Sequence, residues 1–344
     1  MNRDRLLEIL PRLHGKRIMV VGDLFLDEYL VGRPARISRE APVLVLEYEK
    51  RFCLPGGGTN PARNLQALGA EALMVGVVGE DQNGVELRDL LGSSGIQVDG
   101  VVVDPSRPTI TKTRILAQDG NIIRQQVVRL DRLSRTSLDG SIVGQLIDYL
   151  AEQIENVDGV LLSDYKSGVI APEVIDACHD LTHRHKKLLT VDSQGDLLRF
   201  KGFGLVKSNQ AEANVTLGEN LDSEDSFKLA CQRILKESDA CVVVITRGGN
   251  GMSVMEAGGP YVHIPVANRS EVFDVTGAGD TAIAMLTVAL AAGARPIEAA
   301  QLANYAAGLV VRKIGNATTS VDELRETIES SRFPRVDPEQ DFLR

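Results

Sequence analysis

The sequence lacks an apolar segment long enough to cross a membrane. Its longest apolar stretch, around residues 281–294, is shorter than the roughly 18 residues that a spanning helix requires. The charged start, Met-Asn-Arg-Asp-Arg, is not followed by an apolar region with a small-residue cleavage site. Such a start does not resemble a secretory signal. We therefore expect a cytoplasmic protein with no membrane partner.

Cysteine and positive charge are also scarce. The four cysteines, at positions 53, 178, 231 and 241, have no C-x-x-C spacing, which favours reduced thiols over disulfides or a zinc site. Lys and Arg number 38 against 47 Asp and Glu, giving a net charge of −9. This balance argues against nucleic acid as a partner, because backbone binding needs cationic side chains. An anionic substrate must therefore be held by locally concentrated cations.

What is present is the composition of an ordinary globular protein. Hydrophobic residues make up 43% of the chain and charged residues 25%, so neither disorder nor a membrane class is indicated. A chain of 344 residues can form one large α/β domain with an appendage, or two domains.

Apolar runs that alternate with helical patterns predict the main fold. Residues 17–22 form a continuous apolar run, as expected for a strand buried on both faces of a parallel sheet. The segment that follows, residues 22–27, is not G-x-G-x-x-G, which disfavours a dinucleotide site. The alternation predicts a doubly wound, mostly parallel sheet with helices on both faces. The further strands are expected at 73–78, 160–163, 188–191, 204–206 and 241–246, and the helices near 83–92, 137–155, 172–185, 223–237, 297–313 and 321–330.

Two regions without helical patterns interrupt this alternation. Short β-prone pieces fill residues 28–52 and again 98–131, separated by proline, Asp-Pro and Asp-Gly-Asn turns. We expect both insertions to form one small β domain, a lid, on a body that spans residues 1–330. Residues 331–344, rich in charge and proline, are expected to be a flexible tail.

The most informative stretch is Asp274-Val-Thr-Gly-Ala-Gly-Asp280, which runs into an apolar, helix-favouring segment. Small residues let the backbone approach a ligand, and a helix start leaves several N–H groups unpaired. An aspartate ending such a loop is well placed to take a proton from a nucleophile. The loop is therefore typical of a phosphoryl-transfer site with Asp280 as its base. A glycine-rich turn that caps a buried helix is the alternative.

Polar residues follow several of the predicted strands, at the edge where open α/β sheets bind ligands. They include Asp164, Asp192 and the segment 246–251. Asn209 and Glu212 stand three apart after another strand. Glu212 can hold Mg²⁺ through water when phosphates supply the other oxygens. The alternative is a helix N-cap with a reciprocal capping box.

Basic residues gather in the second β insertion. Lys112 and Arg114 are two apart on one strand and therefore share a face. Two alternatives remain open, a solvated surface whose charges discourage aggregation or a site for a second phosphate on the substrate. Nearby in sequence are Arg107, Arg124, Arg129 and Arg132.

Three motifs in this order resemble the ribokinase or PfkB family of carbohydrate kinases. They are Gly56-Gly57 with Asn60, Asn209-x-x-Glu212, and the segment 274–280. The likeness covers residues 14–330. Within the family, the sequence is most similar to kinases of heptose 7-phosphate, which phosphorylate O1 on the route to ADP-heptose and lipopolysaccharide. Such kinases are often fused to a nucleotidyltransferase; here a stand-alone kinase is expected. The stretches that carry this likeness are 22–27, 36–43, 60–64, 109–114, 129–131, 163–165 and 302–308.

The resemblance implies a role for each matching residue. Asp280 is the expected base, and the backbone of Gly277, Ala278 and Gly279 the expected anion hole. Sugar contacts are expected from Asp27, Gly57, Asn60 and Asn64, with a substrate phosphate near Lys112, Arg114 and Arg129.

The resemblance also implies the cofactors and the assembly. ATP is the expected donor, with Mg²⁺ held through Glu212 and with K⁺ beside the anion hole at Asp274 and Thr276, near Gly315. The β lid is expected to form a homodimer surface. The nucleotide pocket is expected to contain Asn209, Thr246, Gly249, Gly251 and Asn304.

Two positions depart from the family pattern, and two other functions remain open. Residues 192–195 read Asp-Ser-Gln-Gly where Asp-Pro-Lys-Gly is common, and Arg63 adds a charge in the sugar-side helix. Both leave the sugar open, so a PfkB kinase for another sugar, sugar phosphate or nucleoside is one alternative. A non-catalytic sugar-binding regulator is the alternative from another class.

Overall fold

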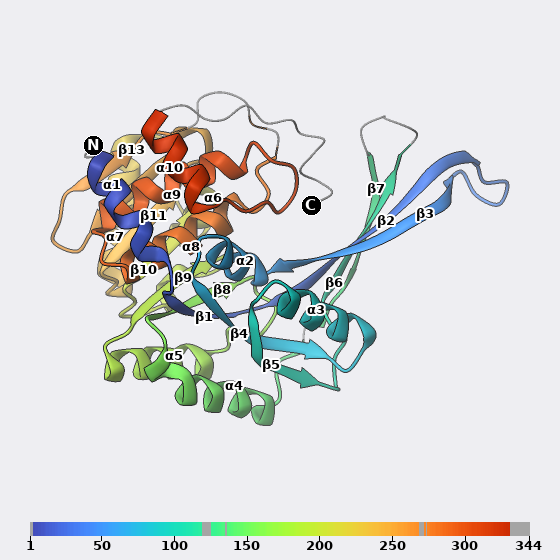
Figure 1. Ribbon diagram of the computed structural model, residues 1–344, viewed down its shortest axis with the longest axis horizontal. Helices are drawn as coiled ribbons and strands as arrows, with labels where there is room; N and C mark the ends of the chain where they lie inside the picture. Colours follow the sequence, from blue (N-terminus) through green and yellow to red (C-terminus); the bar gives the residue numbers. More distant parts are fainter. Residues whose placement is uncertain (1–2, 119–124, 135, 268–271, 273, 331–344) are drawn as a thin grey trace.

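The computed structural model describes residues 3–118, 125–134, 136–267, 272 and 274–330. The tail predicted at 331–344 and Arg124 lie outside these ranges. A sheet of nine strands forms the centre of the described structure, and the fold class predicted from the sequence is confirmed (Figure 1). Its spatial order is β13 (Tyr261–Ile264), β12 (Met252–Glu256), β11 (Val242–Thr246), β10 (Leu205–Asn209), β9 (Leu188–Ser193), β8 (Gly159–Asp164), β1 (Arg17–Gly22), β4 (Glu71–Gly79) and β5 (Gln97–Asp104).

The strands from β11 to β5 are parallel, and β12 and β13 add an antiparallel edge. The position of β1 explains why its residues form an apolar run, because alternate residues of the strand pack into two different cores. Ile18 and Val20 pack into one core, whereas Met19 and Val21 pack into the other. A strand with both faces covered needs apolar residues at every position.

Ten helices in the described ranges cover the two faces (Figure 1). The first face carries α1 (Arg3–Ile9), α2 (Thr59–Ala67), α3 (Gln82–Ser93), α8 (Ala278–Ala291), α9 (Pro296–Val310) and α10 (Val321–Ser330). The second face carries α4 (Gly140–Gln153), α5 (Pro172–His185), α6 (Gln210–Leu217) and α7 (Glu224–Ser238). No helix in these ranges is both long and apolar enough to span a bilayer.

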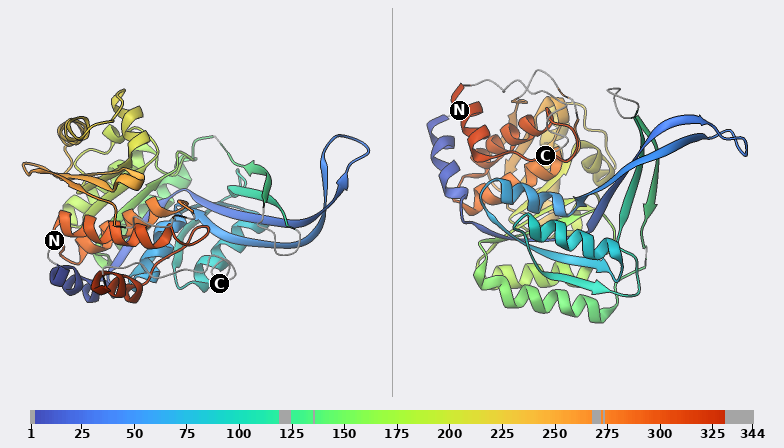
Figure 2. Two further views of the ribbon diagram at one scale, coloured as in Figure 1. Left: turned by 90° about the horizontal axis from the view of Figure 1, so that it is seen from above. Right: turned by 45° about the vertical axis from the view of Figure 1, so that its right-hand side comes forward.

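A second sheet of four strands, called here the small sheet, projects from the body (Figure 2). Its order is β3 (Leu44–Gly57), β2 (Leu24–Ile37), β6 (Thr111–Ala117) and β7 (Gln125–Arg132). The insertion boundary predicted at residue 98 is wrong. Strand β5 pairs with β4 in the main sheet, because the α3 crossover returns the chain parallel to its neighbour. The second insertion therefore begins near Thr111.

The register of the main sheet aligns four residues at the carboxyl ends of adjacent strands. Gly22 pairs with Ser163, Ser163 with Asp192, and Asp192 with Lys207. Residues paired in register point to the same side of a sheet. The row therefore lies on the α8 side, in line with the first core.

A buried hydroxyl pair fixes α8 on this row. Thr190 of β9 and Thr287 of α8 are 2.8 Å apart between their Oγ1 atoms, and both side chains are fully buried. Thr287 also donates to the carbonyl of Ile283 at 2.8 Å. Thr190 is thus the donor of the pair.

We predict that Thr287→Val destabilises the protein by about 1–3 kcal/mol, because it leaves the Thr190 hydroxyl buried without an acceptor. The double variant Thr190→Val/Thr287→Val should recover most of that loss, since both polar partners are gone and the shapes are kept. Urea unfolding of the three proteins tests this. A double variant no more stable than the single one contradicts it.

Candidate active site

The site forms where α8 begins. Gly277 caps the helix with φ 77°, a left-handed conformation that favours glycine. The amide of Ala278 donates to the carbonyl of Val275, and the first full helical bond runs from Thr281 N to Gly277 O. The amides of Gly279 and Asp280 precede that bond, so they are the ones left to face an anion. Of the backbone predicted as the anion hole, Gly279 thus keeps an amide that is free within the described ranges and Ala278 does not, while the amide of Asp280 is also free.

Asp280 lies in this first turn and is only 6% exposed. Tyr165 Oη donates to its Oδ1 at 2.8 Å, and Asn60 Nδ2 donates to its Oδ2 at 2.9 Å. Burial and the nearby charge of Asp192 raise the pKa of Asp280 to about 6. A carboxylate with this pKa is ionised at neutral pH yet still able to take up a proton.

Tyr165 belongs to a stretch that carries the family likeness, residues 163–165, but no role was predicted for it. It is held by Asp23, a fully buried carboxylate that accepts backbone N–H groups of Tyr165, Ser167 and Val169 at 2.9 to 3.0 Å. Burial and Asp280 raise the pKa of the Tyr165 phenol well above 10. The phenol therefore stays protonated and donates to the base.

No role was predicted for Lys207 from the sequence. Its ammonium is 2.6 Å from Asp192 Oδ2 and would stand 3.0 Å from a Cβ added to Gly279. Burial alone would lower the pKa of Lys207, but Asp192, Glu212 and Asp280 together raise it. A charged lysine thus lies beside the amides at the start of α8, in a chain that lacks the lysine common near residue 194.

Asn209 and Glu212 form the capping box that was one of the two alternatives. Asn209 Oδ1 accepts from Glu212 N at 2.9 Å, and Glu212 Oε2 accepts from Asn209 N at 2.7 Å. Burial and Asp192 raise the pKa of Glu212. The hard oxygens of Glu212 and Asp192 fit Mg²⁺ held largely through water and phosphate. In the described ranges, no three His, Cys, Asp or Glu side chains gather into a metal cage.

The other residues predicted for the nucleotide lie at the end of β11, in the turn to β12 and on α9. Thr246 Oγ1 donates to Ser208 O at 3.3 Å, and Gly249 is exposed. Gly251 and Asn304 meet at Pro265: a Cβ on Gly251 would collide with the carbonyl of Ile264, and Asn304 Nδ2 donates to Pro265 O at 2.7 Å. These two residues therefore also hold the end of β13.

The residues predicted for the sugar come from the base of the small sheet. Asp27 is 3% exposed, with Arg114 at 2.8 Å from its Oδ1 and Asn316 at 3.2 Å from its Oδ2. A Cβ on Gly56 would lie 2.3 Å from Asp27 Oδ2, and Gly57 has φ 60° with the Phe25 ring against it. The glycine pair is thus needed for β3 to pass this carboxylate.

Asn64 supports the site from behind instead of facing its open side. Its Nδ2 donates to Asn60 O at 2.9 Å, and its Oδ1 accepts from Thr281 Oγ1 at 2.8 Å. With only 2% of its surface exposed, Asn64 joins α2 to α8. The predicted sugar contact is therefore better described as a residue that positions Asn60.

Lys112 shares the inner face of the small sheet with Asp27, its partner in register. Its ammonium lies 4.0 Å above the Phe25 ring, and burial lowers its pKa. Arg129 pairs in register with Arg114, but its side chain is 48% exposed and bound to Asp131 at 2.8 Å. The Lys112 ammonium also lies 5.9 Å from the centre of the Tyr165 ring, which places this cation of the small sheet beside the Asp280 cluster.

Asp274 and Arg63, both noted in the sequence, contact the loop after α9. Asp274 accepts N–H groups of Thr276 and Gly315, both at 2.9 Å, and so ties the motif to the loop after α9. Arg63, the unexpected charge in α2, donates to Asn316 O at 3.2 Å, and burial lowers its pKa.

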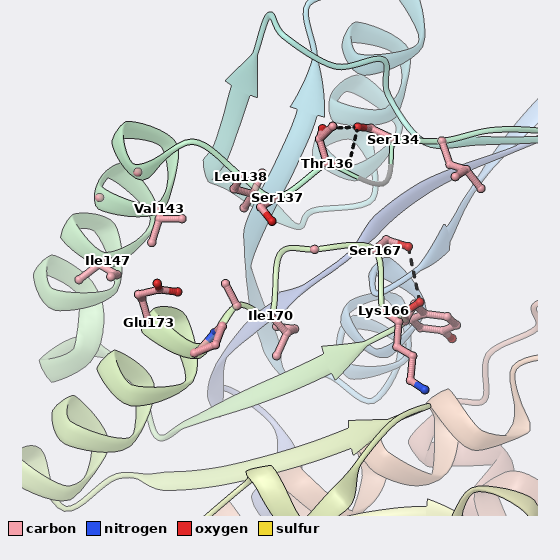
Figure 3. A pocket seen from close by; sticks show the side chains of 17 residues that line it. Ser134, Thr136, Ser137, Leu138, Val143, Ile147, Lys166, Ser167, Ile170 and Glu173 are labelled. Carbon is pink, nitrogen blue, oxygen red and sulfur yellow. Dashed lines mark hydrogen bonds between the residues drawn. The ribbon is translucent and has the colours of Figure 1, made fainter. Parts of the chain in front are cut away.

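A cavity of about 1060 Å³ lies on the far side of the Tyr165 loop, between α4 and α5 (Figure 3). Ser134, Ser137, Ser167 and Glu173 supply much of its polar lining. It meets the Asp280 cluster at Tyr165, and it is also lined by Ser167, whose backbone N–H donates to Asp23. The cavity is therefore a neighbour of the cluster, not part of it.

A buried carboxylate, a helix N-terminus and a paired lysine at the carboxyl edge of a doubly wound sheet are the arrangement expected of a phosphotransferase. Residues 16–323 match the model of the pfkB family of carbohydrate kinases. The chain belongs to this family, as predicted, and is an enzyme that phosphorylates an alcohol group. Its family uses ATP and a divalent metal ion.

Curated relatives and solved structures agree with this membership. The chain is 40% identical to bifunctional protein HldE of Geobacter metallireducens over 94% of its own length and 65% of that protein's. It is 37% identical to HldE of Helicobacter pylori, covering 95% and 69%. The chain thus spans about two thirds of these relatives.

Solved structures match at the level of the fold. Phosphofructokinase-2 from Escherichia coli, in complex with potassium, has a TM-score of 0.72 at 20% identity, covering 92% of this chain and 99% of that one. Ribokinase from Arabidopsis thaliana, complexed with ribose and ATP, has a TM-score of 0.69 at 19% identity, covering 92% and 98%.

We predict that kcat/KM falls as the pH drops through about 6, because protonated Asp280 can no longer accept a proton. Activity should be constant above this value until other groups titrate. Initial rates of ADP release between pH 4.5 and 8 measure the profile, with substrate well below its KM. A profile flat down to pH 5 would contradict this role.

Proposed function

We propose that the enzyme transfers the γ-phosphoryl group of ATP to O1 of D-glycero-β-D-manno-heptose 7-phosphate, giving the 1,7-bisphosphate in the cytoplasm. The observation that carries the reaction type is Asp280, ionisable near neutral pH, at the start of α8 beside Lys207. The sugar rests on the resemblance of the sequence stretches to heptose 7-phosphate kinases.

The base is oriented before substrate arrives. Tyr165 and Asn60 each donate to one oxygen of Asp280, which fixes the plane of the carboxylate. Each oxygen keeps a lone pair for the sugar hydroxyl. As the bond from the sugar oxygen to the γ-phosphorus forms, the bond from that phosphorus to the β,γ-bridging oxygen breaks and ADP leaves. Asp280 takes the hydroxyl proton, and positioning supplies much of the rate.

Charge on the transferring group is balanced by fixed donors. The amides of Gly279 and Asp280 and the ammonium of Lys207 face the same region. Such preorganised groups stabilise charge that develops in the transition state. Glu212 would hold Mg²⁺ through water, and the ion would further neutralise the ATP phosphates; Asp274 and Thr276 would hold K⁺.

The substrate phosphate is proposed to lie on the small sheet. Lys112 is its main partner, and Arg129 can reach it as the sheet approaches the body. Arg114 is committed to Asp27 at 2.8 Å and acts by orienting that carboxylate toward the sugar. This division supports a substrate with a phosphate at one end and hydroxyls at the other.

The small sheet is proposed as a lid that excludes water, which would otherwise accept the phosphoryl group. Its edge strands β7 and β3 expose large apolar side chains, including Leu130 at 67% and Tyr48 at 70%. Exposed apolar surface of this kind is typical of an interface. We propose that it forms the homodimer contact, which sedimentation at micromolar concentration tests.

We predict that Asp280→Asn lowers kcat by about 10²- to 10⁴-fold, the usual contribution of a general base. ATP affinity should change little, because the amides and Lys207 remain. A coupled ADP assay and a nucleotide titration measure the two quantities. Retention of more than about a tenth of the activity removes Asp280 from the role of base.

Thermal unfolding of the same variant separates lost chemistry from lost folding. Because burial raises the pKa of Asp280 to about 6, its ionised form opposes folding above that pH. Asp280→Asn should therefore melt at a higher temperature than the natural protein at pH 8. The difference should shrink as the pH falls through about 6 and vanish below about 3.8, the ordinary pKa of this carboxyl in the unfolded chain.

We predict that Lys112→Ala raises KM for heptose 7-phosphate by about tenfold or more, because a charge-assisted contact to the phosphate is lost. The KM for ATP should stay constant. Lys228→Ala, an exposed lysine on α7, is the matched control. An equal effect on a sugar without a phosphate would show that Lys112 does not bind one.

A further inference from the structure

Asn316 lies in the loop after α9 and joins the two halves of the site. Its Nδ2 donates to Asp27 Oδ2 at 3.2 Å, on the sugar side. Its Oδ1 would be 3.2 Å from a Cβ on Gly277, so it lies against the start of the anion hole. No sequence motif pointed to this residue.

The backbone around Asn316 is held from two directions. Arg63 of α2 donates to its carbonyl at 3.2 Å, and Asp274 of the motif accepts from Gly315 N at 2.9 Å. The amide orientation is fixed as well, since exchanging its oxygen and nitrogen would set an oxygen against the Asp27 carboxylate. The position of Oδ1 is therefore built into the loop.

Asn316 Oδ1 is buried and has no hydrogen-bond partner within the described ranges. A buried acceptor without a donor is costly and is rarely left so in a folded protein. Asn60 Oδ1, beside Asp280, is a second such atom. Two unpaired acceptors flank the two carboxylates of the site.

The missing partner must bring hydrogen-bond donors. A phosphate or carboxylate that is ionised at neutral pH offers mainly acceptors, whereas a polyol offers O–H groups. The region between Asp27 and Gly277 is thus suited to the hydroxyl-bearing end of a sugar. Lys112, on the small sheet, is suited to the opposite, anionic end.

We propose that Asn316 is a specificity-determining residue that accepts a hydrogen bond from a sugar hydroxyl next to the one that is phosphorylated. The inference rests on the proposed sugar-kinase function but not on the identity of the sugar. A sugar lacking that hydroxyl leaves the Asn316 oxygen unpaired in the complex. A site built for a hydroxyl discriminates strongly against such an analogue.

The experiment compares the natural protein with Asn316→Ala, using the sugar that the natural protein phosphorylates fastest and its monodeoxy analogues. We expect Asn316→Ala to lower kcat/KM for the full sugar by about 10- to 100-fold, mainly through KM, with the KM for ATP unchanged. One analogue should react poorly with the natural protein. That discrimination should disappear in the variant.

Two controls isolate the hydrogen bond from packing. Asn316→Leu keeps the approximate volume and should lose the same discrimination as Asn316→Ala. Asn220→Ala removes an exposed asparagine far from the cluster and should behave as the natural protein. Melting temperatures of all variants show whether the loop still folds.

The inference is overturned if each analogue gives the same ratio of kcat/KM with Asn316→Ala as with the natural protein. It is also overturned if the variant changes only kcat. Failure of heptose 7-phosphate to yield ADP would remove the proposed substrate but not this test, because the best substrate from the sugar panel takes its place.

Discussion

The structure depends on keeping one carboxylate ionisable inside the protein. Burial disfavours the charge of Asp280, yet the base must carry that charge at neutral pH. Tyr165, Asn60 and Lys207 offset the cost by hydrogen bonds and by charge, and each comes from a different element. The remaining residues of the cluster serve to hold these three. Asp23 orders the Tyr165 loop, Asn64 orients Asn60, and Asp192 is the counterion of Lys207.

Two sheets divide the work around this carboxylate. In the proposed reaction the main sheet supplies the phosphate side through the register of its strand ends, where Asp192 and Lys207 are adjacent. The small sheet would then supply the sugar side, where Asp27 and Lys112 are adjacent in register. Helix α2, which starts between them, carries Asn60 across to α8. The loop at Asn316 closes the ring by touching both Asp27 and the motif glycine.

The parallel sheet and a role for the motif could be predicted because both depend on patterns that are local in the sequence. Apolar runs reveal strands buried on two faces, and small residues before an apolar helix reveal an anion site. Strand β5 was assigned to the wrong sheet, since its composition resembles that of the small sheet and only its distant partner β4 decides. Lys207 could not be told from an ordinary charged residue by its sequence neighbours. Its partner Asp192 lies fifteen positions earlier and meets it only through the strand register. No local sequence pattern marks Asn316, because it comes to lie beside Asp27 and Gly277 only in the folded structure.

The pairing of Asp192 with Lys207 also constrains how the chain assembles. The side chain of Lys207 is 4% exposed and that of Asp192 15%, so each alone would be a charge largely removed from water without a counterion. A β9 covered by α8 before β10 arrives would therefore be unfavourable. A one-residue slip of β10 would send Lys207 to the opposite core, away from Asp192. The ion pair thus favours the native register of β9 and β10 over a slipped one.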